Sequence, residues 1–159
     1  MKSIVRYIQM RRQAASVLLL SLILFVSGCG GDAKAPFDAI VTGPEDDDFT
    51  VSGAAAPSIV LPLEFQVRDV SGTVALPDVE IELFAGGGGI LTDIDGNPLD
   101  PNNPTYFKTK TDDRGLTRTA FLISLPGCGA ESVVMTGSVT ATVGSASALW
   151  TGTFTIEEC

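Results

Sequence analysis

The most regular feature of the sequence is an alternation of apolar and polar residues that recurs through its later two thirds. In residues 59–67 every odd-numbered side chain is apolar, while Glu64 and Gln66 lie between them. A period of two places alternate side chains on opposite faces of a strand, so each such run predicts a half-buried strand. The runs with this pattern are 37–41, 59–67, 79–83, 107–111, 133–143 and 146–156.

Residues 116–124 are almost continuously apolar, as expected of a strand buried inside a sandwich. No stretch after Cys29 has apolar residues at helical spacing, and four consecutive glycines at 86–89 indicate a flexible turn. About seven short strands separated by turn residues therefore predict an all-β fold, a single antiparallel β-sandwich over residues 37–159.

The last two runs are predicted to form a hairpin. They are separated by Gly144-Ser145, and glycine at the first central position suits a type II′ turn. This turn pairs Val139 with Trp150, so that the apolar faces match and Trp150 belongs to the core. The opposite face then carries mostly hydroxyl groups, with Thr136, Ser138, Thr140 and Thr142 facing Thr153, Thr151, Leu149 and Ser147.

The first 28 residues differ in composition from the rest. They contain four basic residues and no acidic one, whereas the remainder has six basic against nineteen acidic residues, a formal charge of −13. Residues 14–26 are apolar and uncharged; as a helix at ~1.5 Å per residue they span about 20 Å, too short for a bilayer core of about 30 Å. The basic start, the short apolar stretch and the small residues Ser27 and Gly28 predict a signal peptide over residues 1–28.

The segment Val26-Ser27-Gly28-Cys29 resembles the lipobox of bacterial lipoproteins, with Val in place of the usual Leu. The resemblance implies cleavage before Cys29, fatty acylation (palmitate) of that cysteine, and attachment of the mature chain to a membrane by its lipid. Gly30, in place of the Asp that retains such proteins at the inner membrane, implies the outer membrane. Residues 29–36 would then be the lipidated cysteine and a flexible tether. The alternatives are ordinary cleavage that leaves a free cysteine, or an uncleaved anchor.

Lipidation of Cys29 leaves a pair of cysteines, Cys128 and Cys159. An even pair in an exported protein predicts a disulfide bond. The predicted hairpin supports this pairing, because its partners sum to 289 and the two cysteines sum to 287, just beyond its open end. A closed loop of about thirty residues would stabilise the fold by roughly 3–4 kcal/mol. The alternative is two unpaired thiols.

Several segments resemble bacterial Ig-like domains of the intimin and invasin kind. Residues 67–72 and the strand at 79–84 resemble the first half of such a domain, and Thr111-Asp112-Asp113-Arg114-Gly115 resembles its Thr-Asp-x-x-Gly turn. The resemblance covers residues 63–156 and implies an Ig-like sandwich with a structural or adhesive role. Relative to that family, residues 92–104 look like an insertion.

The residue content argues against catalysis and nucleic-acid binding. The chain has no histidine, which removes His-based triads, most zinc sites and the commonest general base. No glycine pattern is followed by a helix, so no phosphate-binding loop is expected. The negative charge after Cys29 disfavours binding to nucleic acid. We therefore predict that the protein is not an enzyme.

Two segments are candidate binding sites. Asp93, Asp95 and Asp100 lie around Gly96, and Ca²⁺ takes six to eight oxygen ligands from such flexible loops. The same residue types are also what ordinary turns contain. The hydroxyl-rich hairpin face is the second candidate, for a glycan or a protein strand, although threonine also suits solvated strand positions.

These observations predict a membrane-anchored lipoprotein of the bacterial cell envelope that carries a non-catalytic Ig-like module for adhesion-like or envelope interactions. Its protein or glycan partner is not identified by the sequence. One alternative is a periplasm-facing accessory subunit of an envelope assembly or transporter that docks through apolar residues such as Phe84, Val60 or Leu149. Another is a calcium-dependent ligand-binding module.

Overall fold

The computed structural model describes residues 38–52 and 58–158 of the chain. Contacts define two units, Met1–Asp32 and Ala33–Cys159, and every described residue belongs to the second. The described residues form strands and turns, and none of them lies in a helix that could span a bilayer. The nine strands are β1 Ile40–Thr42, β2 Asp47–Val51, β3 Ser58–Arg68, β4 Glu80–Gly86, β5 Ile90–Thr92, β6 Tyr106–Lys110, β7 Leu116–Ser124, β8 Val133–Val143 and β9 Ala146–Ile156.

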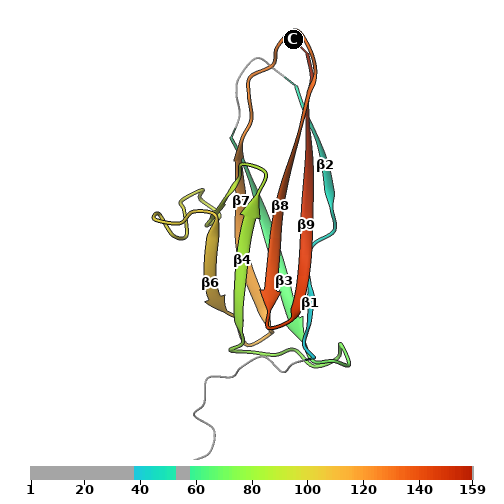
Figure 1. Ribbon diagram of the computed structural model, residues 1–159, viewed down its shortest axis with the longest axis vertical. Coiled ribbons are helices and arrows are strands. Elements are labelled where there is room, and N and C mark those ends of the chain that lie inside the picture. The colour runs from blue at the N-terminus through green and yellow to red at the C-terminus, as the bar shows by residue number, and fades with distance from the viewer. Residues whose placement is uncertain (1–37, 53–57, 159) are drawn as a thin grey trace, which may run out of the picture. The chain divides into compact units, whose positions relative to one another are not determined.

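The strands form two sheets that pack face to face (Figure 1). One sheet has the order β1-β3-β7-β5 and the other has the order β2-β9-β8-β4-β6. Consecutive strands alternate between the two sheets until the β8–β9 hairpin, so most connections cross the top or bottom of the sandwich. The fold is an Ig-like β-sandwich, which confirms the predicted fold class.

The segments with the most regular alternation form strands, and the apolar side chains that were predicted to face the core are buried or half-buried. Leu63, Phe65 and Val67 of β3 are buried, and so are Ile81 and Leu83 of β4. The β8–β9 hairpin has the predicted register: Val143 pairs with Ala146 and Val139 pairs with Trp150. Gly144 has a φ of 59° at the first central position of the turn, a conformation that glycine adopts without strain.

Strand β2 was not predicted, and it corrects the expectation of a purely antiparallel sandwich. It runs parallel to β9, with Phe49 opposite Phe154 and their rings stacked at 5.1 Å between centroids. Side chains of the acidic run also hold it in place, because the Thr151 amide donates to Asp46 at 2.7 Å and the Trp150 indole N–H donates to Asp47 at 3.4 Å. Asp46 and Asp47 thus join β2 to the sheet.

Strand β5 lies where the sequence suggested only a glycine turn and an insertion. After β4 the chain turns through residues 86–89 and pairs β5 with β7, with Leu91 opposite Phe121. Gly89 is required here, because a Cβ at this position would come within 2.0 Å of the Phe121 ring. The short strand therefore lies against the largest side chains of the core.

The centre of the core is an edge-to-face contact between Phe121 of β7 and Trp150 of β9, whose ring centroids are 5.3 Å apart. Both side chains are fully buried. Gly137 and Gly152, which are partners in the β8–β9 hairpin, make room for them. A Cβ on Gly137 would approach the Phe121 ring to 2.5 Å, and one on Gly152 would approach the Trp150 ring to 2.7 Å.

Replacing Gly137 by Ala should therefore lower the free energy of unfolding by about 1–3 kcal/mol, the usual cost of overpacking a core. Urea unfolding of the purified domain measures this change. Gly129→Ala is the matched control, because a Cβ there meets nothing within 4 Å. Equal stability of the two variants would contradict the packing described for Phe121.

Candidate functional site

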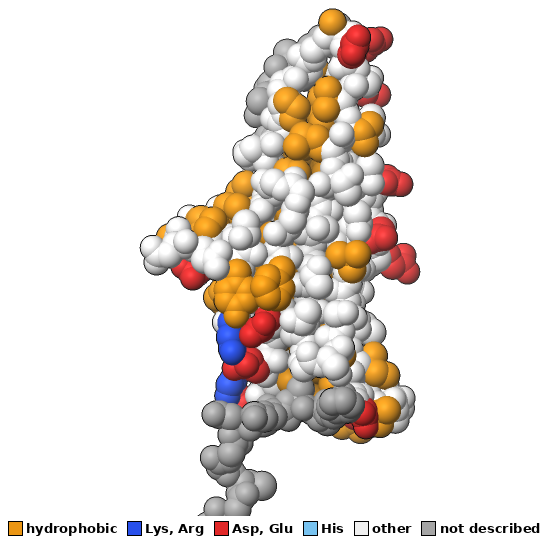
Figure 2. Space-filling model, viewed as in Figure 1, with side chains coloured by type: hydrophobic (Ala, Val, Ile, Leu, Met, Phe, Trp, Pro, Cys, Tyr) orange, Lys and Arg blue, Asp and Glu red, His pale blue; other side chains and the backbone are white. Residues whose placement is uncertain are grey.

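The outer face of the five-stranded sheet carries a row of exposed and half-buried side chains that crosses four strands. Tyr106 of β6 pairs with Phe84 of β4, Phe84 pairs with Thr140 of β8, and Thr140 pairs with Leu149 of β9. We call these four residues the apolar row. Phe84 is 42% exposed and Leu149 is 60% exposed, and the rings of Phe84 and Tyr106 lie 5.0 Å apart. Figure 2 shows apolar atoms gathered on this face above a group of charged side chains.

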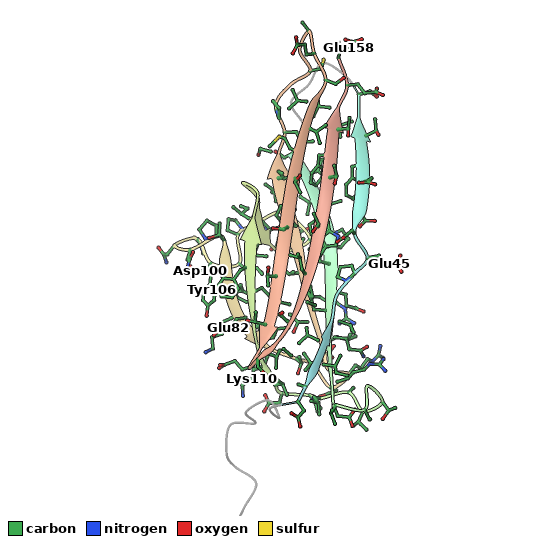
Figure 3. The ribbon with its side chains drawn as sticks, turned by 45° about the vertical axis from the view of Figure 1, so that its right-hand side comes forward. Glu45, Glu82, Asp100, Tyr106, Lys110 and Glu158 are labelled. Carbon is green, nitrogen blue, oxygen red and sulfur yellow. The ribbon has the colours of Figure 1, made fainter. Side chains whose placement is uncertain are left out.

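Charged side chains border the Tyr106 end of the apolar row. Lys108 lies 2.7 Å from Glu80 and 3.6 Å from Glu82, and Figure 3 shows Glu82 beside Tyr106. Desolvation and the negative charge of Glu82 raise the pKa of Tyr106 above its ordinary value of 10.0. Exposed pairs of this kind add little stability, and the one lysine against two glutamates leaves this border of the row with a single negative charge in excess.

The rest of this face is rich in hydroxyl groups, as predicted. Thr136 pairs with Thr153, Ser138 pairs with Thr151, and Thr142 pairs with Ser147. These side chains are exposed or half-buried, and Leu149 interrupts them as expected from the register. The face therefore combines apolar anchors with short polar groups that lose little rotamer freedom on binding.

Of the three residues expected to form a contact patch, the structure brings two together. Phe84 and Leu149 lie in the apolar row, whereas Val60 belongs to β3 in the other sheet. Val60 is half-buried because the loop after β5 covers it; its Cγ2 atom would lie 3.5 Å from a Cβ on Gly96. Tyr106 was missed, because the sequence does not show which strand lies beside β4.

The four-stranded sheet carries a cavity of about 430 Å³ on its outer side. Pro62, Arg118, Ile94 and Leu99 are among its lining residues. Thr92 also lines it, and the Thr92 hydroxyl is buried without a hydrogen-bond partner. Most of the exposed wall is apolar, and the polar groups at its edge are those of Glu64, Asp93, Arg118 and Thr119.

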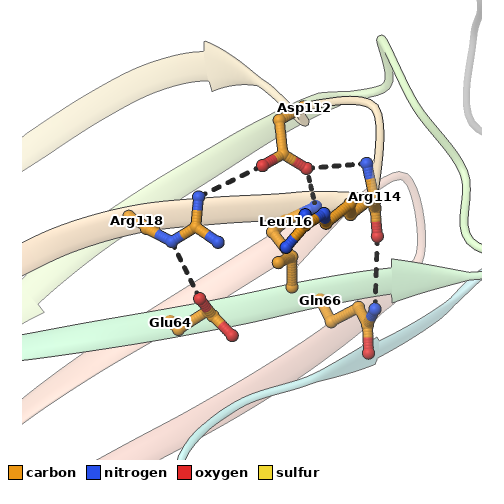
Figure 4. A network of polar contacts seen from close by, with 6 residues as sticks. All are labelled: Glu64, Gln66, Asp112, Arg114, Leu116 and Arg118. Carbon is orange, nitrogen blue, oxygen red and sulfur yellow. Dashed lines mark hydrogen bonds and ion pairs between the residues drawn. The ribbon is translucent and has the colours of Figure 1, made fainter.

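The charged group beside this cavity is already paired (Figure 4). Arg118 donates through Nε to Glu64 at 2.9 Å and through Nη1 to Asp112 at 3.2 Å. Asp112 in turn accepts from the amides of Arg114 and Leu116 at 2.8 and 2.9 Å. This network fixes the turn between β6 and β7 and contains no nucleophile with an adjacent base.

Asp112 belongs to a turn that occurs three times in the domain with the spacing Asp-x-x-Gly. In each turn the amide of the glycine donates to the carbonyl of the aspartate, and the glycine has a positive φ of 70°, 87° or 69°. The carboxylate accepts amide hydrogen bonds from the following residues, and these bonds lower its pKa. The three turns are 69–72, 93–96 and 112–115.

This turn accounts for Asp93, one of the three candidate calcium ligands. Its carboxylate accepts from the Asn97 side-chain amide at 3.0 Å and from the Asn97 backbone amide at 2.9 Å. Asp100 accepts from the amide of Asn102 at 2.9 Å, and Asp95 donates its own amide to Asp93. Within residues 38–52 and 58–158, no three acidic or sulfur side chains are placed to hold a metal ion. Calcium binding stays a prediction that the loop geometry does not favour.

Two covalent modifications are predicted, lipidation of Cys29 and a disulfide bond between Cys128 and Cys159, and of these cysteines the structure describes only Cys128. Cys29 and Cys159 lie outside the described residues, so lipidation and the disulfide stay predictions. Cys128 is half-buried against the core, and the hairpin register on which the pairing argument depends is confirmed.

Comparison with known proteins finds no matching family model and no matching curated protein. Among solved structures, a PapD-like domain of human CEP192 has a TM-score of 0.42 at 10% identity, covering 84% of this chain and 96% of that domain. AggA, the major subunit of aggregative adherence fimbriae type I from Escherichia coli, also has a TM-score of 0.42 at 10% identity. That match covers 75% of this chain and 95% of AggA. Similarity this low carries no argument about what this chain does.

The hydrogen bonds to the three turn aspartates predict how the free energy of unfolding of the domain changes with pH. The pKa values of these aspartates in the folded state lie below the ordinary 3.8. The stabilisation that their ionised carboxylates give to the folded domain is therefore complete above about pH 4, and it is lost as the pH falls through the lowered pKa values. Asp112→Asn should therefore destabilise the domain at pH 7, and its stability should converge with that of the parent chain as the pH falls through the lowered pKa of Asp112; urea unfolding across pH measures both.

The control for this prediction is Asp113→Asn, a neighbouring exposed carboxylate with no hydrogen bond in the described structure. It should leave the acid dependence unchanged. The explanation fails if both variants have the same profile, or if the difference between Asp112→Asn and the parent chain grows as the pH falls.

Proposed function

We propose that this chain is a bacterial envelope lipoprotein whose Ig-like domain is a non-catalytic binding module. Three features support the proposal: the signal segment and lipobox in the sequence, the absence of a nucleophile with an adjacent base at the polar networks of the described domain, and the exposed apolar row. The apolar row is the observation that carries the proposal, because it gives the domain an exposed binding surface.

The apolar row has the features of a protein-binding surface. Aromatic side chains supply large contact areas with few rotatable bonds, and aromatic residues are enriched where protein interfaces concentrate their binding energy. Each residue of the row sits on a different strand of one sheet, so hydrogen bonds of the sheet hold the four at fixed spacing. The surrounding hydroxyl groups provide a polar rim.

The row supports two roles that differ in the side of the membrane that the domain faces. In the first, the lipid anchor holds the domain on the outer membrane and the row mediates adhesion to a protein or glycan outside the cell. In the second, the domain faces the periplasm and docks as an accessory subunit of an envelope assembly. The apolar row and its hydroxyl-rich surroundings are compatible with both roles, so the location of the domain distinguishes them.

Replacing Cys29 by Ser should remove the lipid and release the protein from the membrane. The expected result is loss of the acyl mass and transfer of the protein from the detergent phase to the aqueous phase. Gly30→Ser is the control, since it leaves the acylated cysteine in place. Tight membrane association of Cys29→Ser would show that the anchor is misidentified.

A photocrosslinking amino acid at Leu149 should crosslink a partner in living cells, and Phe84→Ser in the same chain should reduce the yield strongly. The same crosslinker at Ile94, an exposed apolar residue of the loop after β5, should not yield that product. Labelling of intact and permeabilised cells then assigns the partner to the outside or to the periplasm. Equal crosslinking from Leu149 and Ile94 would rule out the apolar row as the binding surface.

A further inference from the structure

A second exposed apolar group lies at one end of the sandwich, away from the apolar row. Val70 is 67% exposed and Val74 is 57% exposed, and both lie in the loop that follows β3. Ile40, at the start of β1, is also exposed, and its Cδ1 atom would lie 3.9 Å from a Cβ on Gly72 of that loop. We call these three residues the end cluster. Figure 2 shows apolar atoms at this lower end of the domain.

The loop that carries the two valines is ordered by its own hydrogen bonds. Asp69 accepts from the amides of Thr73 and Val74 at 3.1 Å, and Arg68 donates to the carbonyl of Gly72 at 2.9 Å. The Asp69 amide donates to the carbonyl of Val74, and the Gly72 amide donates to the carbonyl of Asp69. A loop whose backbone groups are paired internally can enter a medium of low polarity at a smaller desolvation cost than an open loop.

The described chain begins at this same end. Ile40 pairs with Arg68, the last residue of β3, so the start of β1 lies beside the valine loop (Figure 1). Cys29 precedes Asp38 by nine residues, and nine extended residues reach at most about 30 Å. A lipid on Cys29 therefore keeps Asp38 within about 30 Å of the bilayer, and the end cluster lies at the same end of the sandwich as Asp38.

We propose that the end cluster docks on the lipid–water interface of the bilayer that holds the acyl chains of Cys29. This inference rests on the lipid anchor of the proposed function and adds an orientation to it. The sandwich then stands on the loop that carries Val70 and Val74, and the apolar row on the outer face of the sheet stays clear of the membrane.

The charges around the end cluster indicate which lipid surface suits it. The described loops and strand ends at this end of the domain carry six acidic and three basic side chains: Asp38, Asp69, Asp78, Glu80, Asp112, Asp113, Arg68, Lys110 and Arg114. A surface with this balance gains nothing from anionic headgroups and is repelled by a strongly negative membrane. The contact is therefore apolar and favours zwitterionic lipid.

The test uses the full lipidated chain in phosphatidylcholine vesicles, with an environment-sensitive fluorescent amino acid in place of Val70, Val74 or Val134. Val134 is the matched control, because it is 63% exposed and lies at the opposite end of the sandwich in β8. We expect a blue-shifted emission and quenching by brominated lipids at positions 70 and 74, and neither at position 134. Replacing half of the lipid by phosphatidylglycerol should weaken both signals.

Three results would overturn the inference. If all three positions report the same aqueous environment while the protein still floats with the vesicles, the anchor is intact and the end cluster does not dock. If the signals strengthen with phosphatidylglycerol, the contact is electrostatic and not the one described. If the purified chain carries no lipid and does not float, the lipid anchor of the proposed function fails as well.

Discussion

The edge-to-face contact between Phe121 and Trp150 is the interaction on which the arrangement of the two sheets depends. Phe121 comes from the four-stranded sheet and Trp150 from the five-stranded sheet, so the pair spans the interior. The two rings fit only because Gly89, Gly137 and Gly152 leave space for them. Those glycines in turn set the place of β5 and the close approach of β8 and β9 to the core. Such an aromatic pair contributes about 0.5–1.5 kcal/mol beyond its buried area.

Much of this framework could be predicted from the sequence, because it depends on a local period. The faces of β3 and β4 follow from strict alternation, and the β8–β9 register follows from two apolar runs of opposite parity around Gly144. Strand β2 could not be predicted in this way. Its sequence is acidic, and what places it is a parallel pairing with β9 across about a hundred residues together with the stacking of Phe49 on Phe154.

The candidate surface was also predictable only in part, because strand pairing between residues far apart in the sequence determines which side chains lie next to one another. The sequence identified Phe84 and Leu149 as exposed apolar residues and paired Thr140 with Leu149, but it did not show that Phe84 lies on the other side of Thr140 or that Tyr106 extends the row. The Asp-x-x-Gly turns could be recognised from the sequence, because the aspartate and the glycine of each turn are only three residues apart. In the sequence, Asp93 suggested a calcium ligand; in the structure, its carboxylate holds the turn through Asn97. Part of the acidity of this domain thus orders its loops.

The position of β9 has a consequence for when this domain can fold. The final strand lies inside its sheet, between β2 and β8, and it supplies Trp150 and Phe154 to the core. Until residues 146–156 are free, neither β2 nor the aromatic centre has its partner. A ribosome whose exit tunnel still encloses these residues therefore keeps the sheet without this inner strand, and the sandwich closes only after β9 has emerged.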